Sequence, residues 1–478
     1  MISSDRTVCD LLLTGGSVIT VDDQRAVHEP GAVAISGERI VAVGTPDELD
    51  GYRAERVIDC AGKAVLPGFV DSHTHLFQSL GRGLGEGMSL YPWLSDFMWP
   101  YARQITREQA WAGIRLTALE AARAGTTAVV DDHYAPVDLE TTVGVARTIE
   151  EVGLRGVVAR GIYGAPAEVT RHYDIPDYLF ELSPEEELEI TGAAIEATAG
   201  RQVGVWPAPD GNFIDRQLII DSVALAHELD ARWHYHCSAP QTDPAAYVSC
   251  YGERPVVWMQ RAGILDERAA LSHGVWLDDE EVSYLGEAGA GVTHCPTSNC
   301  YMADGAIRMG DLRSAGAVVS LGTDGSACDH RQDMFEQMKQ AIFVQRLTTL
   351  DPTALRSEEA LELATREGAR YLDIDAGVLA PGKLADIAVV DLDRVHLQPL
   401  NRTISTLVYA ARGSDVVMTI VGGEVIYENG ASTKVDEAEV IAEARARSAE
   451  LIERAGITGL LTPWRHRPVE RGPVLEGG

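Results

Sequence analysis

Eight short segments of β-type sequence recur between residues 65 and 324, and this repetition constrains the fold more than any other feature of the chain. Amphipathic stretches such as residues 107–125, whose apolar residues return every three or four positions, separate most of the segments. An order of β then α, repeated in this way, predicts an α/β fold of the (β/α)8 TIM-barrel type. The eight segments are residues 65–76, 126–133, 155–161, 202–209, 232–237, 269–274, 290–296 and 318–324.

The two ends of the chain are rich in β-type sequence of another kind. Residues 10–62 are a run of short strands with tight turns, and residues 384–392 and 416–430 form a second such stretch. We therefore expect one small β-sandwich domain, made of residues 1–62 and 381–435, beside a catalytic barrel of residues 63–380. Helical spacing from about Asp436 to Ala455 predicts a surface helix, followed by a tail, in residues 436–478.

Charge and composition restrict the partners of the protein. With 40 Lys+Arg against 72 Asp+Glu, the net charge is −32, and nucleic-acid binding is not expected because phosphates need a basic surface. No stretch approaches about 18 consecutive apolar residues, so no membrane partner is expected. The seven cysteines show no CxxC spacing and the first residues do not resemble a signal peptide. These features favour a cytoplasmic enzyme with a small-molecule substrate.

Polar residues gather at the ends of the predicted barrel strands, where TIM barrels build their active sites. Residues i and i+2 of a strand point to the same side, so His73 and His75 can both face one point in the barrel mouth. Three imidazoles and one carboxylate would suit Zn(II) or Fe(II) and leave a position for water. Further candidates at strand ends are His234, His236, His273, His294 and Asp324.

Several motifs resemble those of the amidohydrolase superfamily, in its cytosine deaminase and triazine hydrolase (chlorohydrolase) branch. The motifs are VLPGFVDSHTHL, LSHGVW, THCPTSN and GTDGSA, and the resemblance covers nearly the whole chain. It implies that His273 hydrogen-bonds the metal-bound water or the substrate, that Gln78 contacts a substrate ring, and that the protein is a homo-oligomer, either a dimer or a tetramer. It also implies one divalent ion, with zinc preferred over iron or another divalent metal, held by His73, His75, His236 and Asp324.

The scarcity of lysine bears on the number of metal ions. Dinuclear members of the superfamily bridge two metals with a carboxylated lysine, whereas this chain has no lysine between Lys63 and Lys339. A single metal is therefore expected. It would lower the pKa of a bound water toward neutrality, so that hydroxide could attack an electron-poor carbon.

Three further residues are candidates for substrate contact. Trp93, together with the neighbouring aromatic residues Tyr91, Phe97 and Trp99, could wall a pocket for a flat ligand, or could pack beneath a long loop. His133 and His294 could contact substrate, or could be structural histidines.

Position 239 departs from the pattern of the family. Deaminases of this branch carry a proton-shuttling glutamate three residues after the histidine at the end of strand five, and here that position is Ala239. One hypothesis is a hydrolase in which Asp324 or His273 is the base. It would cleave a carbon–nitrogen bond, or a carbon–sulfur or carbon–halogen bond, of a small and mostly uncharged cyclic or heteroaromatic substrate, and would not cleave peptide bonds.

Two alternatives to this hypothesis stay open. The first is a deaminase of a purine, pyrimidine or triazine whose general base has been relocated to a carboxylate such as Asp132, Asp210 or Asp243. The second is an inactive relative that only binds its ligand.

Overall fold

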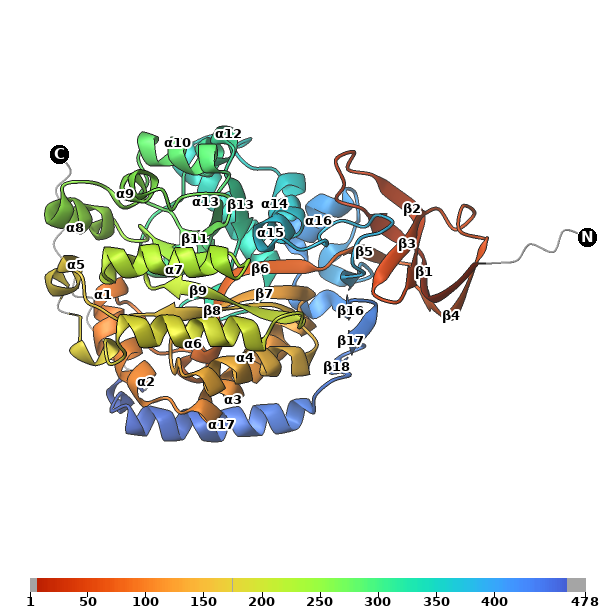
Figure 1. Cartoon of the computed structure of the whole chain (residues 1–478). Helices are drawn as coiled ribbons and strands as arrows, with labels where there is room; N and C mark the ends of the chain where they lie inside the picture. The colour runs from red at the N-terminus through yellow and green to blue at the C-terminus, as the bar shows by residue number, and fades with distance from the viewer. Residues whose placement is uncertain (1–6, 174, 462–478) are drawn as a thin grey trace, which may run out of the picture.

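The computed structural model describes residues 7–173 and 175–461 (Figure 1). The predicted barrel strands are all present, and they lie in two parallel sheets. The five-stranded sheet has the order β14-β6-β7-β8-β9, and the four-stranded sheet has the order β10-β11-β12-β13. The strands are β6 (Phe69–His75), β7 (Thr126–His133), β8 (Arg155–Ile162), β9 (Val203–Pro209), β10 (Trp233–Cys237), β11 (Ala269–His273), β12 (Gly291–His294), β13 (Val318–Leu321) and β14 (Asp324–Gly325).

The predicted α/β class with parallel strands is confirmed. The eighth predicted strand is divided at residues 322–323 into β13 and β14, and β14 pairs with β6. Within the described residues no hydrogen-bonded ladder joins β9 to β10, so the closed barrel stays a prediction.

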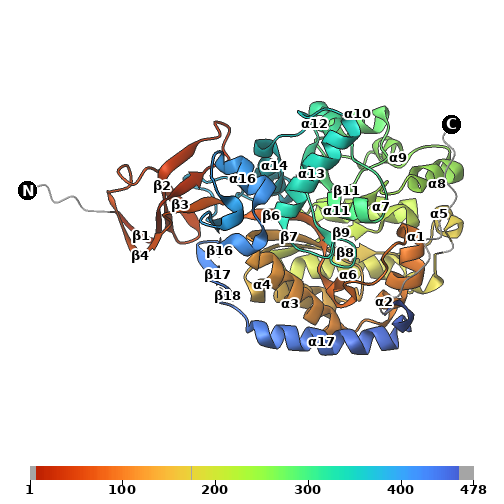
Figure 2. The same cartoon turned by 180° about the vertical axis from the view of Figure 1, so that it is seen from behind.

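Helices alternate with these strands and surround them (Figures 1 and 2). Their starts are encoded locally, since Thr106, Ser183 and Asp278 form capping boxes with the residue three positions later. The helices between β6 and the C-terminal strands are α1 (Leu90–Trp93), α2 (Trp99–Gln104), α3 (Arg107–Arg123), α4 (Leu139–Val152), α5 (Glu168–His172), α6 (Pro184–Ala197), α7 (Arg216–Glu228), α8 (Thr242–Tyr251), α9 (Pro255–Ala262), α10 (Asp279–Ala288), α11 (Pro296–Tyr301), α12 (Met309–Ala315), α13 (Met334–Thr349), α14 (Ser357–Ala364) and α15 (Arg366–Leu372).

The β segments from the two ends of the chain meet in one continuous nine-stranded sheet. Antiparallel pairing of β5 with β15 joins the N-terminal strands to the C-terminal ones. Helix α16 (Thr403–Ala410), which sequence patterning missed, lies between β15 and β16. The sandwich arrangement and the domain boundaries stay predictions. The strands are β1 (Thr7–Ile19), β2 (Val27–Ser36), β3 (Arg39–Gly44), β4 (Tyr52–Asp59), β5 (Lys63–Pro67), β15 (Ile387–Asp391), β16 (Val416–Val421), β17 (Glu424–Glu428) and β18 (Ala431–Ser432).

The predicted C-terminal helix is present as α17 (Glu437–Arg454), which runs along the outside of α3 (Figures 1 and 2). Arg123 and Arg115 of α3 form ion pairs with Glu437 and Glu443 of α17. The predicted tail falls mostly on residues 462–478, which lie outside the described residues. No helix within residues 7–173 and 175–461 is long and apolar enough to span a lipid bilayer.

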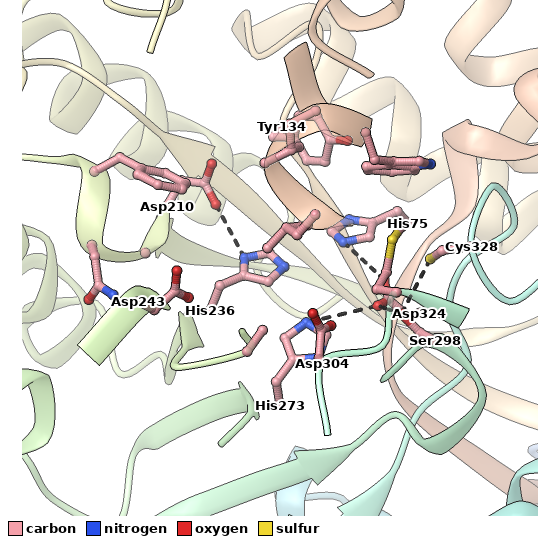
Figure 3. Close-up of a pocket in the computed structure, with 18 of the residues that line it drawn as sticks. His75, Tyr134, Asp210, His236, Asp243, His273, Ser298, Asp304, Asp324 and Cys328 are labelled. Carbon is pink, nitrogen blue, oxygen red and sulfur yellow. Dashed lines mark hydrogen bonds and ion pairs between the residues drawn. The ribbon is translucent and has the colours of Figure 1, made fainter. Parts of the chain in front are cut away.

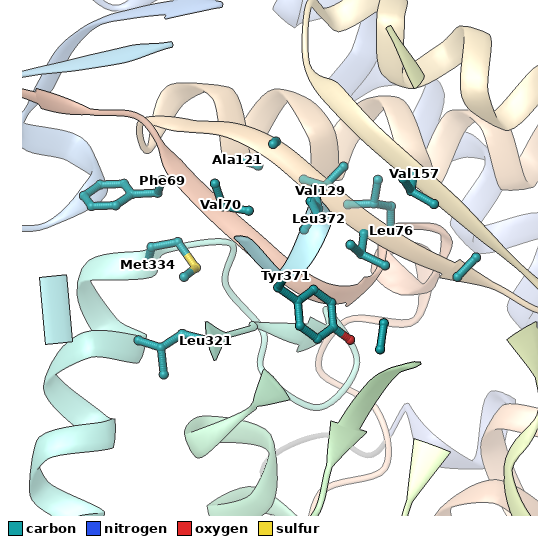
Figure 4. Close-up of a cluster of buried hydrophobic side chains, with 14 of the residues drawn as sticks. Phe69, Val70, Leu76, Ala121, Val129, Val157, Leu321, Met334, Tyr371 and Leu372 are labelled. Atoms are coloured by element: carbon teal, nitrogen blue, oxygen red, sulfur yellow. The ribbon is translucent and has the colours of Figure 1, made fainter. Parts of the chain in front are cut away.

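Apolar side chains from distant segments fill the space behind the strand ends. Phe69 of β6 packs edge-on against Phe335 of α13, with ring centroids 4.8 Å apart. Figure 4 shows Val70, Leu321 and Tyr371 converging on the same cluster. A densely packed base of this kind resists displacement, so it holds the strand ends, and the polar residues on them, in fixed positions.

Gly156 tests how tightly the strands pack. Its φ is +148°, and a Cβ there would lie 2.0 Å from the carbonyl oxygen of Val129 on β7. Gly156→Ala is therefore expected to lower the free energy of unfolding by about 2 kcal/mol or more, because backbone must shift. Gly204→Ala on β9 is the matched control, since a Cβ there meets nothing within 4 Å. Denaturant unfolding of the two variants measures the difference, and equal stabilities would contradict the prediction.

Candidate active site

The four predicted metal ligands come together at the ends of their strands, and Figure 3 shows three of them, His75, His236 and Asp324. The Nε2 atoms of His73 and His75 lie 3.7 Å and 3.4 Å from Oδ1 of Asp324. The ring of His236 lies 4.9 Å from that of His73 and 5.3 Å from that of His75, measured between centroids. Three imidazoles and one carboxylate, contributed by β6, β10 and β14, thus lie close together. The groups of described residues whose ligand atoms all lie within 4.8 Å of one another are His73 with His236 and His273, His73 with Asp132 and His234, and His73 with Cys295 and Asp324.

Each ligand ring has an outer partner that leaves one nitrogen free. Nδ1 of His75 donates to the carbonyl oxygen of Asp132 at 2.7 Å, and Nδ1 of His236 lies 3.2 Å from Oδ1 of Asp210. Nδ1 of His73 lies 3.0 Å from Nε2 of His234. Such partners orient metal-ligating imidazoles and select their tautomers.

The donor set fits a divalent cation. Nε2 of His73 is buried and has no hydrogen-bond partner among the described residues, which is costly unless a ligand satisfies it. Burial lowers the pKa of His75 to about 4 and that of His73 well below its ordinary value, so both rings are neutral, as metal ligation requires. Three nitrogens and one oxygen suit zinc, although they do not discriminate sharply against iron.

Carboxylates control the charge of the other two ligands. Burial disfavours the imidazolium of His236, but Asp132 and Asp210 outweigh this and raise its pKa to about 9. A cation at the cluster would compete with that proton. Burial likewise opposes ionisation of Asp324, yet facing histidines, the hydroxyl of Ser298 and the N–H of Gly325 hold its pKa below the ordinary value. Ser298 donates to Oδ2 of Asp324 at 2.5 Å and so fixes this carboxylate.

His273 faces the cluster from the end of β11. Its Nε2 lies 3.9 Å from Oδ2 of Asp324, and one of its ring nitrogens lies within 4.8 Å of nitrogens of His73 and His236. The amide Nδ2 of Asn299 lies 3.2 Å from Nδ1 of His273, and the same amide nitrogen is 3.5 Å from Oδ2 of Asp304. With Asn299 donating to Nδ1, the proton of the neutral ring is on Nε2, which faces the site.

The cluster opens into a cleft of about 830 Å³. Gln78 and Trp93, two of the predicted substrate contacts, line it, and Gln78 donates to the hydroxyl of Tyr134 at 2.9 Å. The Oε1 atom of Gln78 is buried against the backbone of Gly325 and finds no hydrogen-bond partner in the described part of the chain. Other aromatic residues that line the cleft are Trp99, Tyr134, Tyr163 and Phe213.

The structure does not support substrate contact by His133 or His294. Neither is among the described residues that line the cleft. His133 is fully buried, with Nε2 2.9 Å from the carbonyl oxygen of Pro136 and its ring edge-on to Phe77. His294 is also fully buried, and burial lowers its pKa to about 3. Their positions at strand ends were correct, but both rings turn into the packed interior.

Of the aromatic residues after strand one, Trp93 and Trp99 line the cleft, as expected. Phe97 is fully buried beneath the loop, and the hydroxyl of Tyr91 donates to Asp243 at 2.7 Å.

Several residues of the site were not expected from sequence. Tyr134 and Tyr163 directly follow β7 and β8, so their place at strand ends was a usable signal. Asp304 follows α11 in a loop, and nothing local indicated that it reaches the cleft. Asp132, a candidate base, is not among the described lining residues and instead lies 3.6 Å from His236 and 3.5 Å from His234.

Imidazoles and a carboxylate at the ends of parallel strands, beside an open cleft, define the class: this is a metal-dependent hydrolase. The chain belongs to the amidohydrolase family, whose model matches residues 64–426. The resemblance seen in the sequence is thereby confirmed, and with it an enzyme that acts on carbon–nitrogen bonds.

Known relatives cover nearly the whole chain. A 5-methylthioadenosine/S-adenosylhomocysteine deaminase from Pelotomaculum thermopropionicum is 32% identical over 449 residues, which are 94% of this chain and 100% of that protein. The crystal structure of a zinc-bound adenosine deaminase from Xanthomonas campestris has a TM-score of 0.87 at 28% identity, covering 93% and 99% of the two chains. Zinc-bound atrazine chlorohydrolase from Arthrobacter aurescens has a TM-score of 0.83 at 25% identity, covering 92% and 100%.

Proposed function

We propose that this protein is an aminohydrolase that replaces the exocyclic amino group of an adenine nucleoside by oxygen and uses one divalent ion, preferably zinc. The observation that carries the proposal is the cluster of His73, His75, His236 and Asp324, of which the last three line a cleft with aromatic walls. Relatives named as deaminases of adenosine derivatives support the same function. The similarity to these deaminases favours the deaminase with a relocated general base over a hydrolase in which Asp324 or His273 is the base.

The roles of the residues follow from their positions. His73, His75, His236 and Asp324 would hold the ion, whose Lewis acidity would activate water for attack. Nε2–H of His273 would donate to the attacked side of the ring, and Ser298 would hold Asp324 in place. Gln78 would contact the substrate ring from the wall of the cleft. We infer as well that the two parallel sheets are halves of one (β/α)8 barrel. The cytoplasmic location and the dimer or tetramer stay predictions.

The charge of the cleft predicts selection against phosphorylated substrates. Asp210, Asp243, Asp304 and Asp324 line it, and none of the described lining residues is Lys or Arg. A phosphate would therefore meet carboxylates without a cationic side chain to pair with, which costs several kcal/mol. We expect kcat/KM for 5′-methylthioadenosine to exceed that for adenosine 5′-monophosphate by about 10²-fold or more.

Ammonia release from the two compounds, measured with metal-loaded protein, checks this prediction. Adenosine serves as the control, since it shares the base and ribose and carries no phosphate. Equal turnover of the phosphorylated compound would show that the carboxylates do not govern selection. No ammonia from any of the three compounds would contradict the proposed function itself.

A second candidate function is favoured by Ala239. Without a glutamate at this position, a substrate whose leaving group departs with little proton assistance would be hydrolysed more easily, and the fold similarity to atrazine chlorohydrolase fits that function. Product analysis separates the candidates, because release of chloride, an amine or a thiol from a substituted ring, without ammonia from nucleosides, would favour the broader hydrolase. If neither the nucleosides nor the substituted rings are turned over, the remaining alternative is an inactive relative that only binds its ligand.

A further inference from the structure

Position 239 lacks the carboxylate that transfers a proton in related deaminases, so another group of the cleft has to perform this transfer. Ala239 follows β10, is 6% exposed and lines the cleft. A methyl group cannot carry a proton from water to a leaving amine. Because the loss of a general acid or base typically costs about 10² to 10⁴ in rate, an active deaminase needs a carboxyl group from elsewhere.

Two of the four carboxylates that line the cleft have another role, one as a proposed metal ligand and one as the partner of a ligand ring. Asp324 belongs to the ligand set and accepts from Ser298 and from the N–H of Gly325. Asp210 lies 3.2 Å from Nδ1 of His236 and accepts from the hydroxyl of Tyr163, so it holds a ligand ring. Asp243 and Asp304 are left.

Asp243 lies beside the vacated position. The turn from Pro240 to Asp243 is closed by a hydrogen bond of 3.1 Å from the N–H of Asp243 to the carbonyl oxygen of Pro240. This turn begins α8 (Thr242–Tyr251), and within it the backbone N–H of Ala239 lies near enough to the Asp243 carboxylate to lower its pKa. Figure 3 shows Asp243 next to His236, on the side away from His75. Asp304 instead comes from the loop after α11 and contacts Asn299.

The surroundings of Asp243 suit a group that gains and loses a proton. Its side-chain partner, the hydroxyl of Tyr91, is a neutral donor at 2.7 Å, and the ring of Tyr91 is stacked on Tyr173 with centroids 3.8 Å apart. No salt bridge to Lys or Arg ties the carboxylate down among the described residues. Burial raises the pKa of Asp243 to about 6, near the working range of a general base at neutral pH.

We propose that Asp243 performs the proton transfer that a glutamate at position 239 would otherwise perform. This inference rests on the proposed deaminase function. The carboxylate of Asp243 takes a proton from the attacking water as the new carbon–oxygen bond forms at the carbon that bears the amino group. It then gives this proton to the leaving nitrogen as the carbon–nitrogen bond breaks. Water and the amino compound are consumed, ammonia and the oxo compound are released, and the carboxylate is regenerated.

The central test compares three variants with the wild type. Asp243→Asn is expected to keep its metal and lose about 10² to 10⁴ in kcat, because the amide cannot accept the proton. Adding Ala239→Glu to Asp243→Asn is expected to restore at least about tenfold of that loss, by supplying a carboxylate at the neighbouring position. Ala239→Glu alone is not expected to raise turnover, because two carboxylates side by side disfavour each other's ionisation.

Asp304→Asn, with and without Ala239→Glu, is the matched control, since Asp304 is the other carboxylate of the cleft that is not engaged. Glutamate at position 239 should rescue only the Asp243 variant. The proposal is overturned if Asp243→Asn keeps turnover within about threefold of wild type. It is equally overturned if Ala239→Glu rescues Asp304→Asn and leaves Asp243→Asn inactive.

The pH profile gives a readout that a merely structural role would not move. The wild-type kcat should fall as the pH drops through about 6, where Asp243 becomes protonated, and this acidic limb should be absent from the rescued double variant or shifted in it. An unchanged limb would contradict the proposal. The titratable groups that face Asp243 are Tyr91, Tyr173, Tyr235, His236, Cys237 and Asp304.

Substrate choice keeps this test separate from that of the proposed function. The variants are assayed on whichever compound the wild type turns over, 5′-methylthioadenosine or a chlorotriazine. Turnover of the triazine alone would refute the nucleoside deaminase. The variants would then test only the first half of the role of Asp243, the removal of a proton from the attacking water, because chloride leaves without a proton. If neither compound reacts, infrared titration of both proteins decides. Burial raises the pKa of Asp71, Asp131 and Asp304 to about 7, so their bands occur in both proteins, and subtracting the Asp243→Asn spectra from the wild-type spectra must leave one carboxyl band that titrates near pH 6. A subtraction that leaves no such band overturns the assignment.

Discussion

Replacement of His73 by alanine is expected to remove the metal and the activity together. The Nε2 atom of His73 is buried and aimed at the cluster, and no described residue offers it a hydrogen bond. Water cannot easily take its place, because the ring is fully buried behind His75 and His236. Losing one of four ligands should lower metal affinity beyond the roughly 10- to 100-fold that loss of an outer partner typically costs.

Metal content per chain and turnover, measured on the same preparations, check this expectation. His227→Ala is the control, because His227 lies on the surface of α7, where it pairs with Asp266 at 2.8 Å. The control should keep about one ion per chain and wild-type turnover. An active His73→Ala protein with a full complement of metal would show that the ligand set is wrong.

Replacement of His273 by asparagine is expected to have the opposite pattern, with the metal retained and turnover lowered by about 10² to 10⁴. His273 lines the cleft, and Asn299 orients it so that Nε2–H faces the site. Burial lowers the pKa of His273 to about 4, so the ring is neutral at neutral pH and acts as a hydrogen-bond donor there. Asparagine keeps a polar side chain but cannot reproduce the position of that donor.

Metal analysis decides whether His273 is a hydrogen-bond donor or a metal ligand. One of its nitrogens lies within 4.8 Å of nitrogens of His73 and His236, a spacing that a metal ligand would also show. Loss of the ion in His273→Asn would make it a ligand and would refute its role as a donor to the substrate. Above about pH 5, the pH dependence of turnover should have the same shape in His273→Asn as in the wild type, because the pKa of His273 lies below that range.

Local sequence was sufficient to locate the strands and to predict four side chains that lie close together at their ends. The predicted strand ends at His73, His75, His236 and Asp324 agree with β6, β10 and β14, because alternation along a strand is a property of neighbouring residues. Capping boxes begin α3, α6 and α10 for the same reason. Helix α16 was missed, since it lies within a short segment flanked by strands that dominate the pattern.

The sequence predicted the positions of the histidines along the strands better than the directions of their side chains. His133 and His294 stand at strand ends like the ligands do, yet they pack inward against Pro136 and Phe77 or within the closed interior. Position along the chain does not distinguish a ring that points into the cleft from one that points behind it, because that choice depends on which neighbours fill the remaining space.

The sequence by itself determined the parallel α/β class, the family and the residues available to hold a metal, because periodicity and strand-end motifs are encoded over a few neighbouring residues. It also determined that Ala239 lacks a carboxylate. Only the tertiary structure decided which acid could compensate. Asp210 follows β9, Asp243 lies in the first turn of α8 and Asp304 follows α11, and the packing of these three segments brings their carboxylates to one cleft. Contacts between distant segments are set by the whole fold, so no local pattern could rank the three.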